Sequence, residues 1–177
     1  NFDKYNKIHI VACGSAYHTG LVGKYLIEKY ANIEVYVEVA SEYRYKKNFY
    51  DEKTLVIFVS QSGETADTLA ALRFAKNAGY LGSLAVCNVP GSSLVRESDL
   101  SLMTHAGPEI GVASTKAFTT QLTALLLLTL ALRRANLADQ KATDAIESEL
   151  VQALRSLPNI AEATLQLDTQ IEAMAQD

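Results

Sequence analysis

The chain is poor in cysteine, in clustered positive charge and in long apolar runs. It has only two cysteines, Cys13 and Cys87, in 177 residues. We interpret both as small buried hydrophobic residues in a reducing compartment, not as a disulfide or a catalytic thiol. The strongly apolar run of residues 122–132 is too short to cross a bilayer and is typical of a core helix. No N-terminal targeting signal is visible. We therefore expect a cytoplasmic protein without a membrane partner.

The charge pattern disfavours nucleic acid as a partner. The formal net charge is -4, and the basic residues are scattered along the chain. The one basic patch with aromatic residues, residues 43–47, is too short to form a binding surface for nucleic acid. A hydrophobic fraction of 49% and a charged fraction of 20% instead predict a globular fold with a substantial core.

Apolar runs alternate with mixed segments along the first three quarters of the chain. Near-continuous apolar strands separated by helices indicate a parallel sheet that is covered on both faces. We expect a three-layer α/β fold of the flavodoxin-like type, with five strands in the order 2-1-3-4-5. The expected strands are residues 8–12, 35–39, 55–59, 84–87 and 100–104. The expected helices are residues 17–30, 41–45, 65–78, 94–97 and 115–135.

Several local features of these helices can also be predicted. The first helix should face the sheet with Leu21, Val22, Tyr25 and Leu26, while Gly20 and Gly23 permit a close approach. Ser41 and Ser114 are candidate N-caps of the short second helix and of the long fifth helix. Gly79 should close the helix of residues 65–78.

The pattern becomes purely helical after Ala138. We therefore divide the chain into a domain of residues 1–137 and a helical extension of residues 138–177. In the extension, Ile146, Leu150, Leu154 and Leu157 lie at helical spacing, and Pro158 is expected to start a second segment that ends near residue 175.

The most informative segment is the turn Ser60-Gln61-Ser62-Gly63-Glu64-Thr65. It follows an apolar strand and precedes a helix, so its hydroxyl groups lie beside the positive end of a helix dipole. No lysine follows the glycine, which argues against a nucleotide-binding P-loop. A single phosphate group, as on a sugar phosphate, is the better match.

Two further turns are expected near this one. Ligands of such sheets bind where the strand order reverses, and the turn Gly14-Ser15 lies at that point together with residues 60–65. A third turn, residues 111–114, can close over the same crevice. Taken singly, Ser62 and Ser15 are also ordinary helix N-caps, but their joint position at the switch point favours ligand binding.

Other titratable residues are weaker candidates. Glu64 is interpreted as structural, because a carboxylate would oppose a bound phosphate but is favourable in a first helical turn. His18 fits packing better than ligand binding, and Lys116 fits a solvated position. No cluster has the spacing of metal ligands, so we expect neither a metal nor another cofactor.

Four longer motifs carry a family resemblance. They are residues 12–18 (ACGSAYH), 60–68 (SQSGETADT), 87–97 (CNVPGSSLVRE) and 109–119 (EIGVASTKAFT). Together they resemble the first sugar-isomerase (SIS) subdomain of the glutamine–fructose-6-phosphate aminotransferase family. The turn of residues 60–65 alone is typical of the wider SIS superfamily.

The resemblance implies a set of site residues. The phosphate ligands of the family correspond to Ser60, Gln61, Ser62 and Thr65. Its sugar contacts correspond to Ser15, Ala16, Val112 and Ser114. The family usually has Thr-Ser where this chain has Ser15-Ala16, so Ala16 offers only its backbone N–H to a sugar.

The resemblance also implies a function and partners. The family makes glucosamine 6-phosphate from fructose 6-phosphate and glutamine, with a glutaminase domain and a second SIS subdomain that this chain lacks. The chain would then be the phosphosugar-binding half of the isomerase domain, without catalytic residues of its own. Because the family pairs through its isomerase domains, the resemblance also implies a homodimer. The alternatives are a non-catalytic SIS module that senses a phosphosugar, and a free-standing sugar-phosphate isomerase.

Overall fold

The structure is a computed structural model that describes residues 4–47, 53–111, 113–136 and 143–176. The chain divides into two compact units, residues 1–138 and residues 139–177. The first unit holds a parallel sheet with helices, and the described part of the second is helical.

The sheet of the first unit is confirmed as parallel and five-stranded, in the order β2-β1-β3-β4-β5. Its strands are β1 (Lys7–Ala12), β2 (Glu34–Val39), β3 (Thr54–Ser60), β4 (Gly82–Cys87) and β5 (Leu100–Met103). The central strand β3 is buried over its whole length because helices cover both faces of the sheet. In the register, Ala12 of β1 pairs with Val59 of β3, and Ser60 pairs with Cys87 of β4. The loops that follow β1 and β3 therefore leave the sheet side by side.

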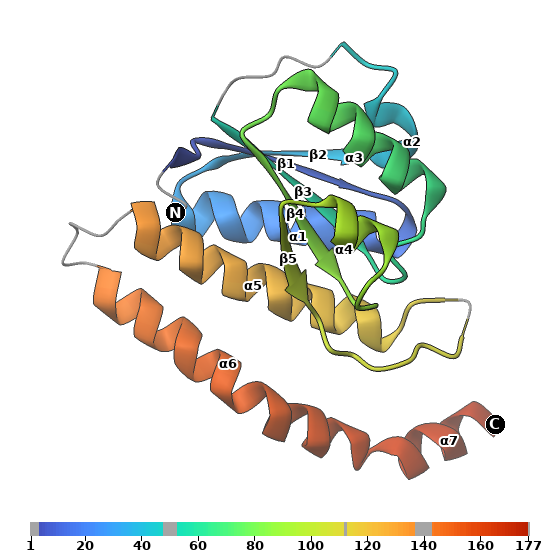
Figure 1. Ribbon diagram of the computed structural model, residues 1–177. Helices are drawn as coiled ribbons and strands as arrows, with labels where there is room; N and C mark the ends of the chain where they lie inside the picture. Colours follow the sequence, from blue (N-terminus) through green and yellow to red (C-terminus); the bar gives the residue numbers. More distant parts are fainter. Residues whose placement is uncertain (1–3, 48–52, 112, 137–142, 177) are drawn as a thin grey trace. The chain divides into compact units, whose positions relative to one another are not determined.

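The helices form two layers (Figure 1). Helices α1 (Gly14–Ala31) and α5 (Lys116–Asn136) lie on one face, where they pack on alternate residues of β1 such as Ile8 and Ile10. Helices α2 (Ala40–Tyr43), α3 (Ala66–Ala78) and α4 (Ser93–Glu97) lie on the other face, where they enclose a second core that includes Val11 and Phe58. The predicted α/β fold with helices on both faces is thus correct.

The predicted inner face of the first helix was wrong at Val22 and Tyr25, whereas Leu21 and Leu26 are partly buried. Val22 and Tyr25 are 42% and 74% exposed, whereas Gly20, Gly23 and Ile27 are buried. An added Cβ at Gly20 would lie 2.9 Å from Ile10 of the sheet, and one at Gly23 would lie 2.9 Å from Leu125 of α5. The predicted close approach at Gly20 and Gly23 is thus confirmed, and these glycines lie on the buried face with Ile27 while Val22 and Tyr25 turn outward.

The predicted helix ends were correct at some positions and wrong at others. Gly79 ends α3 in the left-handed conformation, as predicted. Ser41 is not an N-cap, because α2 begins at Ala40. Ser114 does not cap α5 either: the carboxylate of Glu109 accepts hydrogen bonds from the backbone N–H groups of Thr115 (2.8 Å) and Ala117 (3.1 Å). These bonds hold the pKa of Glu109 below its usual range, and the bond from Thr115 has the largest effect.

The second unit contains α6 (Thr143–Leu165) and α7 (Asp168–Gln176). The predicted restart at Pro158 was wrong, since α6 runs through this proline and the break falls at residues 166 and 167. One proline removes only its own N–H donor, and the remaining hydrogen bonds of a long helix can carry the chain past it. Among the described helices, none combines the length and hydropathy required to cross a bilayer.

Candidate functional site

A cavity of about 480 Å³ lies at the carboxyl ends of β1 and β3. Three loop regions border it: the start of α1, the turn between β3 and α3, and the segment before α5. This is the switch point of the sheet, where β1 is flanked by β2 on one side and β3 on the other. Its lining residues are Cys13, Gly14, Ser15, Ala16, Val59, Ser60, Gln61, Ser62, Thr65, Ala113 and Ser114.

The structure brings seven of the eight predicted site residues to this one cavity. They are Ser15, Ala16, Ser60, Gln61, Ser62, Thr65 and Ser114. The eighth, Val112, lies outside the described residues. Residues separated by about a hundred positions in the sequence thus line the same space.

The turn of residues 60–65, which we call the phosphate loop after the ligand that the sequence predicts for it, is held by its own hydroxyl groups. The Ser60 Oγ atom accepts a hydrogen bond from the Gly63 N–H (3.0 Å) and lies 3.5 Å from the Thr65 Oγ1 atom. The Ser62 Oγ atom accepts one from the Glu64 N–H (3.2 Å). Helix α3 begins at Ala66 with Thr65 as its N-cap residue, so the alternative of Ser62 as N-cap was wrong. A serine oxygen that accepts from the backbone still has its own O–H to donate to an anion.

Gly63 is the residue on which the shape of this loop depends. Its φ is +68°, a left-handed conformation that residues with a side chain rarely adopt. A Cβ at this position would lie 2.1 Å from the Ser92 Oγ atom and 2.9 Å from the Cys87 Sγ atom. The loop can therefore pack closely on the end of β4 and the start of α4 only with glycine here.

Glu64 was expected in the first turn of α3, but it lies before that turn and instead bonds the start of α4. Its Oε1 atom accepts a hydrogen bond from the Ser93 N–H (2.7 Å) at the first residue of α4. That bond holds the pKa of Glu64 below its usual range, and Glu64 is absent from the cavity lining. The carboxylate therefore remains charged near neutral pH while it bonds outside the cavity.

The first helix begins earlier than predicted and presents its N-terminus to the cavity. Helix α1 starts at Gly14, and its N-cap residue Cys13 makes no side-chain capping bond. Ser15 is inside the first turn, so the alternative in which it caps the helix was wrong. The unpaired N–H groups at the start of this helix favour an anion or a polar group in the cavity. Thr19 supports this turn by donating its hydroxyl to the Ala16 carbonyl (2.6 Å).

Sequence reasoning missed some of the lining. Cys13 is only partly buried and lines the cavity, whereas it was predicted to be a buried core residue; Cys87 is buried as predicted. The signal for Cys13 was its place directly after the first strand, next to Gly14. Val59 and Ala113 also line the cavity but offer only apolar surface and backbone groups.

The other polar candidates lie outside the lining. Neither His18 nor Lys116 belongs to it.

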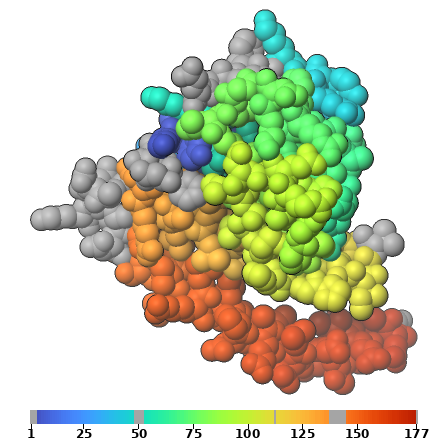
Figure 2. Space-filling model, viewed as in Figure 1, coloured from blue at the N-terminus to red at the C-terminus, as the bar shows by residue number. Residues whose placement is uncertain are grey.

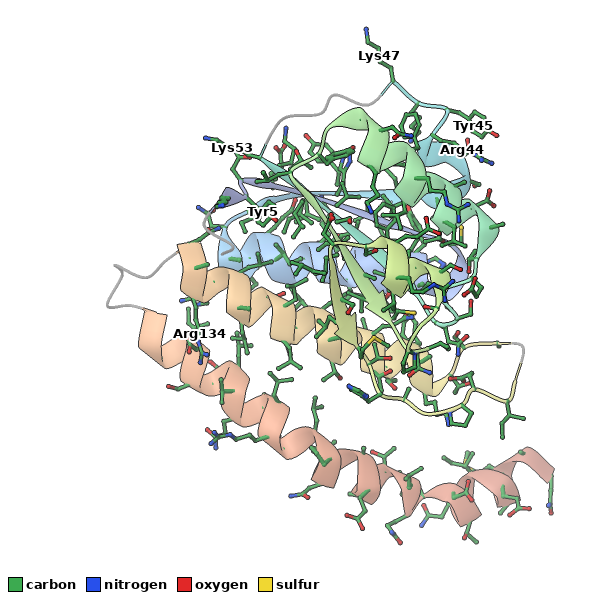
Figure 3. The ribbon with its side chains drawn as sticks, in the orientation of Figure 1. Tyr5, Arg44, Tyr45, Lys47, Lys53 and Arg134 are labelled. Carbon is green, nitrogen blue, oxygen red and sulfur yellow. The ribbon has the colours of Figure 1, made fainter. Side chains whose placement is uncertain are left out.

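At the end of α2, Arg44 pairs with Asp67 (3.3 Å) and stacks over the ring of Tyr45. Figure 3 shows the side chains of Arg44 and Tyr45 at the outer end of this helix. Within the described part of the chain, no group of histidine, cysteine and acidic side chains has the arrangement of a metal site.

Comparisons with known proteins add to this geometry. The model of the SIS domain family matches residues 2–131. The glutamine–fructose-6-phosphate aminotransferase (isomerizing) of Escherichia coli is 57% identical over 175 residues, which cover 98% of this chain and 28% of that protein. The enzyme of the same name from Pseudomonas putida is 56% identical and covers 99% of this chain and 28% of its own length.

A solved structure is similar over nearly the whole chain. The C-terminal domain of glucosamine-fructose-6-phosphate aminotransferase from Francisella tularensis matches with a TM-score of 0.90 and 48% identity. The match covers 98% of this chain and 48% of that chain. This chain thus spans 28% of the length of the curated relatives it matches and about half of the solved domain.

Proposed function

This chain belongs to the SIS domain family, and from that membership we propose that its cavity binds a sugar phosphate through the phosphate loop. The observation that carries the proposal is the convergence of Ser60, Gln61, Ser62 and Thr65 on one cavity beside the start of α3. Hydroxyl and backbone N–H donors at a helix N-terminus suit a phosphate group. The sugar would then extend towards the start of α1 and the segment before α5, where Ser15, Ala16, Val112 and Ser114 are the proposed contacts.

The ligand we propose is fructose 6-phosphate or glucosamine 6-phosphate. The relatives are named as glutamine–fructose-6-phosphate aminotransferases, and this chain matches the Escherichia coli protein along 98% of its own length. In the whole protein, this chain would be the phosphosugar-binding half of the isomerase domain. Residues 1–137 would bind the ligand, and residues 138–177 would lead towards a second SIS subdomain. A glutaminase domain would supply ammonia, and the cytoplasm is the proposed location.

Replacing Ser62 with alanine should weaken the binding of fructose 6-phosphate about ten- to one-hundred-fold. The variant loses one hydrogen bond to a charged group, which contributes roughly 1.5–3 kcal/mol. Calorimetry with fructose 6-phosphate and with fructose measures the effect. Ser101→Ala, at an exposed serine of β5 outside the cavity lining, is the matched control and should bind like the wild type. Equal affinity of the wild type for fructose and fructose 6-phosphate would contradict phosphate recognition.

We also propose that the chain self-associates, most simply as a two-fold dimer. Ile146, Leu150, Leu154 and Leu157 lie within α6 at the spacing of one helical face. Ile146 and Leu157 are 40% and 39% exposed, and exposed apolar residues on one face tend to acquire a partner.

Sedimentation over a wide concentration range should therefore show a mass above that of the monomer. Replacing Leu150 and Leu154 together with glutamate should return the protein to a monomer. The control Gln152→Glu adds a charge about 200° around the helix from Leu150 and should leave the mass unchanged. A wild-type monomer at every concentration would reject the dimer.

A further inference from the structure

The phosphate loop is supported from outside the cavity by the segment of residues 87–94. The Gln61 carbonyl accepts a hydrogen bond from the Asn88 N–H (3.3 Å), and the Gly63 carbonyl accepts one from the Leu94 N–H (3.0 Å). The Glu64 carboxylate adds the bond from the Ser93 N–H. Three residues of the loop, Gln61, Gly63 and Glu64, are thus hydrogen-bonded to one neighbouring segment. Two of the three bonds come from the first two residues of α4.

This support determines the direction of the loop's backbone donors. The described chain contains no cis peptide bond, and in a trans peptide the C=O and the following N–H point in opposite directions. The Gln61 carbonyl is directed towards Asn88. The Ser62 N–H is therefore directed away from Asn88, and Gln61 and Ser62 both line the cavity.

Glu64 is the one charged side chain among these ties. Its bond to the Ser93 N–H is charge-assisted, which makes it stronger than a bond between neutral groups. Arg96 of α4 lies near enough to act on the Glu64 carboxylate, and it also donates to the Gly91 carbonyl and the Ser93 hydroxyl. The carboxylate thus bonds to α4 on a side of the loop that does not line the cavity.

We propose that Glu64 is a positioning residue for phosphate binding, because its bond to Ser93 fixes the phosphate loop on α4 in the conformation that binds. It acts through the loop backbone and does not touch the ligand. This inference rests on the proposed function for its effect on affinity, but its effect on the loop can be measured without any ligand.

Cys87 provides that measurement. Its side chain is fully buried beneath the loop, with the Sγ atom 3.7 Å from the Gln61 carbonyl oxygen and 3.6 Å from the Ser92 Oγ atom. A thiol reagent can reach it only when the loop or α4 moves away. Iodoacetamide labelling followed by peptide mass spectrometry distinguishes Cys87 from the partly exposed Cys13.

The experiment compares Glu64→Ala, Glu64→Gln and a control, Glu97→Gln. The control removes a charge from α4 that pairs with Arg73 of α3 (2.7 Å) and is not one of the ties between the phosphate loop and residues 87–94. Without ligand, Glu64→Ala should raise the labelling rate of Cys87 about ten-fold or more. It should also weaken the binding of fructose 6-phosphate about ten-fold, which is the effect of losing one hydrogen bond to a charged group. Glu64→Gln keeps an oxygen acceptor for the Ser93 N–H but loses the charge, so both values should lie between those of Glu64→Ala and the wild type, while Glu97→Gln should match the wild type.

Two results would overturn the inference. The first is a Cys87 labelling rate in Glu64→Ala equal to that of the wild type. The second is faster labelling with unchanged affinity for fructose 6-phosphate, since the loop would then not need Glu64 in order to bind. If the wild type binds no fructose 6-phosphate but its Cys87 labelling still depends on Glu64, the proposed function has failed and the support of the loop stands.

Discussion

Replacing Gly63 with alanine is expected to lower the free energy of unfolding by about 2–5 kcal/mol and to abolish sugar-phosphate binding. The left-handed φ of +68° costs an alanine about 1–2 kcal/mol. The new Cβ would also lie 2.1 Å from the Ser92 Oγ atom and 2.6 Å from its Cβ atom, and overpacking of this kind costs typically about 1–3 kcal/mol. Ser92 is 4% exposed and Cys87 fully buried, so neither neighbour can move aside freely.

Gly79→Ala is the matched control for this prediction. Gly79 also has a left-handed φ, +84°, but an added Cβ there would meet nothing within 4 Å. Urea unfolding should therefore show only the conformational cost at Gly79, about 1–2 kcal/mol. The double variant Gly63→Ala with Ser92→Gly should recover part of the loss, because it removes the closest atoms. If Gly63→Ala costs no more than Gly79→Ala, the close packing of the loop against Ser92 does not limit the site.

The sheet could be predicted from the sequence because its signal is local. Each strand is a short apolar run, and the runs alternate with helical segments, which requires parallel strands and buries both faces. The order then followed from a general rule for such folds and was confirmed. The cavity followed in turn, since the polar turns after the first and third predicted strands had to meet at one edge of the sheet.

Some errors concern hydrogen bonds whose partners lie farther apart in the sequence than one helical turn. Glu109, not Ser114, bonds the N–H groups at the start of α5 across six to eight positions. Glu64 bonds Ser93 across 29 positions. A capping rule that considers only the nearest hydroxyl cannot detect such partners, because the folded loop brings them together.

The face of α1 was predicted wrongly for a different reason. Hydrophobicity favoured Val22 and Tyr25 as core residues, but close packing against Ile10 and Leu125 depends on the missing side chains of Gly20 and Gly23. Small residues at helical spacing indicate which face of a helix packs closely. A prediction from the size of the apolar side chains alone selects a different face. On the other layer, Arg73 of α3 pairs with Glu97 of α4 (2.7 Å), and Figure 2 shows the green atoms of these two helices as one continuous surface.

The second large effect concerns catalysis: the isolated chain is expected to form no glucosamine 6-phosphate from fructose 6-phosphate, with either glutamine or ammonia. Proton transfer between C1 and C2 of the sugar needs a positioned base, which typically contributes about 10²–10⁴-fold to the rate. Among the residues that line the described cavity, Cys13 is the one with a titratable side chain. Glu64 is engaged with Ser93, and His18 and Lys116 are not part of the lining.

A product assay on the purified chain, with the Escherichia coli relative as the positive control, measures this directly. The informative comparison is between binding and turnover in the same sample. Fructose 6-phosphate that binds and is recovered unchanged places the base outside this chain, as expected for a protein that spans 28% of its relatives' length. Turnover that scales with the concentration of the chain would contradict the prediction. Its loss in Cys13→Ser or in Glu64→Gln would then identify which of these two side chains takes the proton.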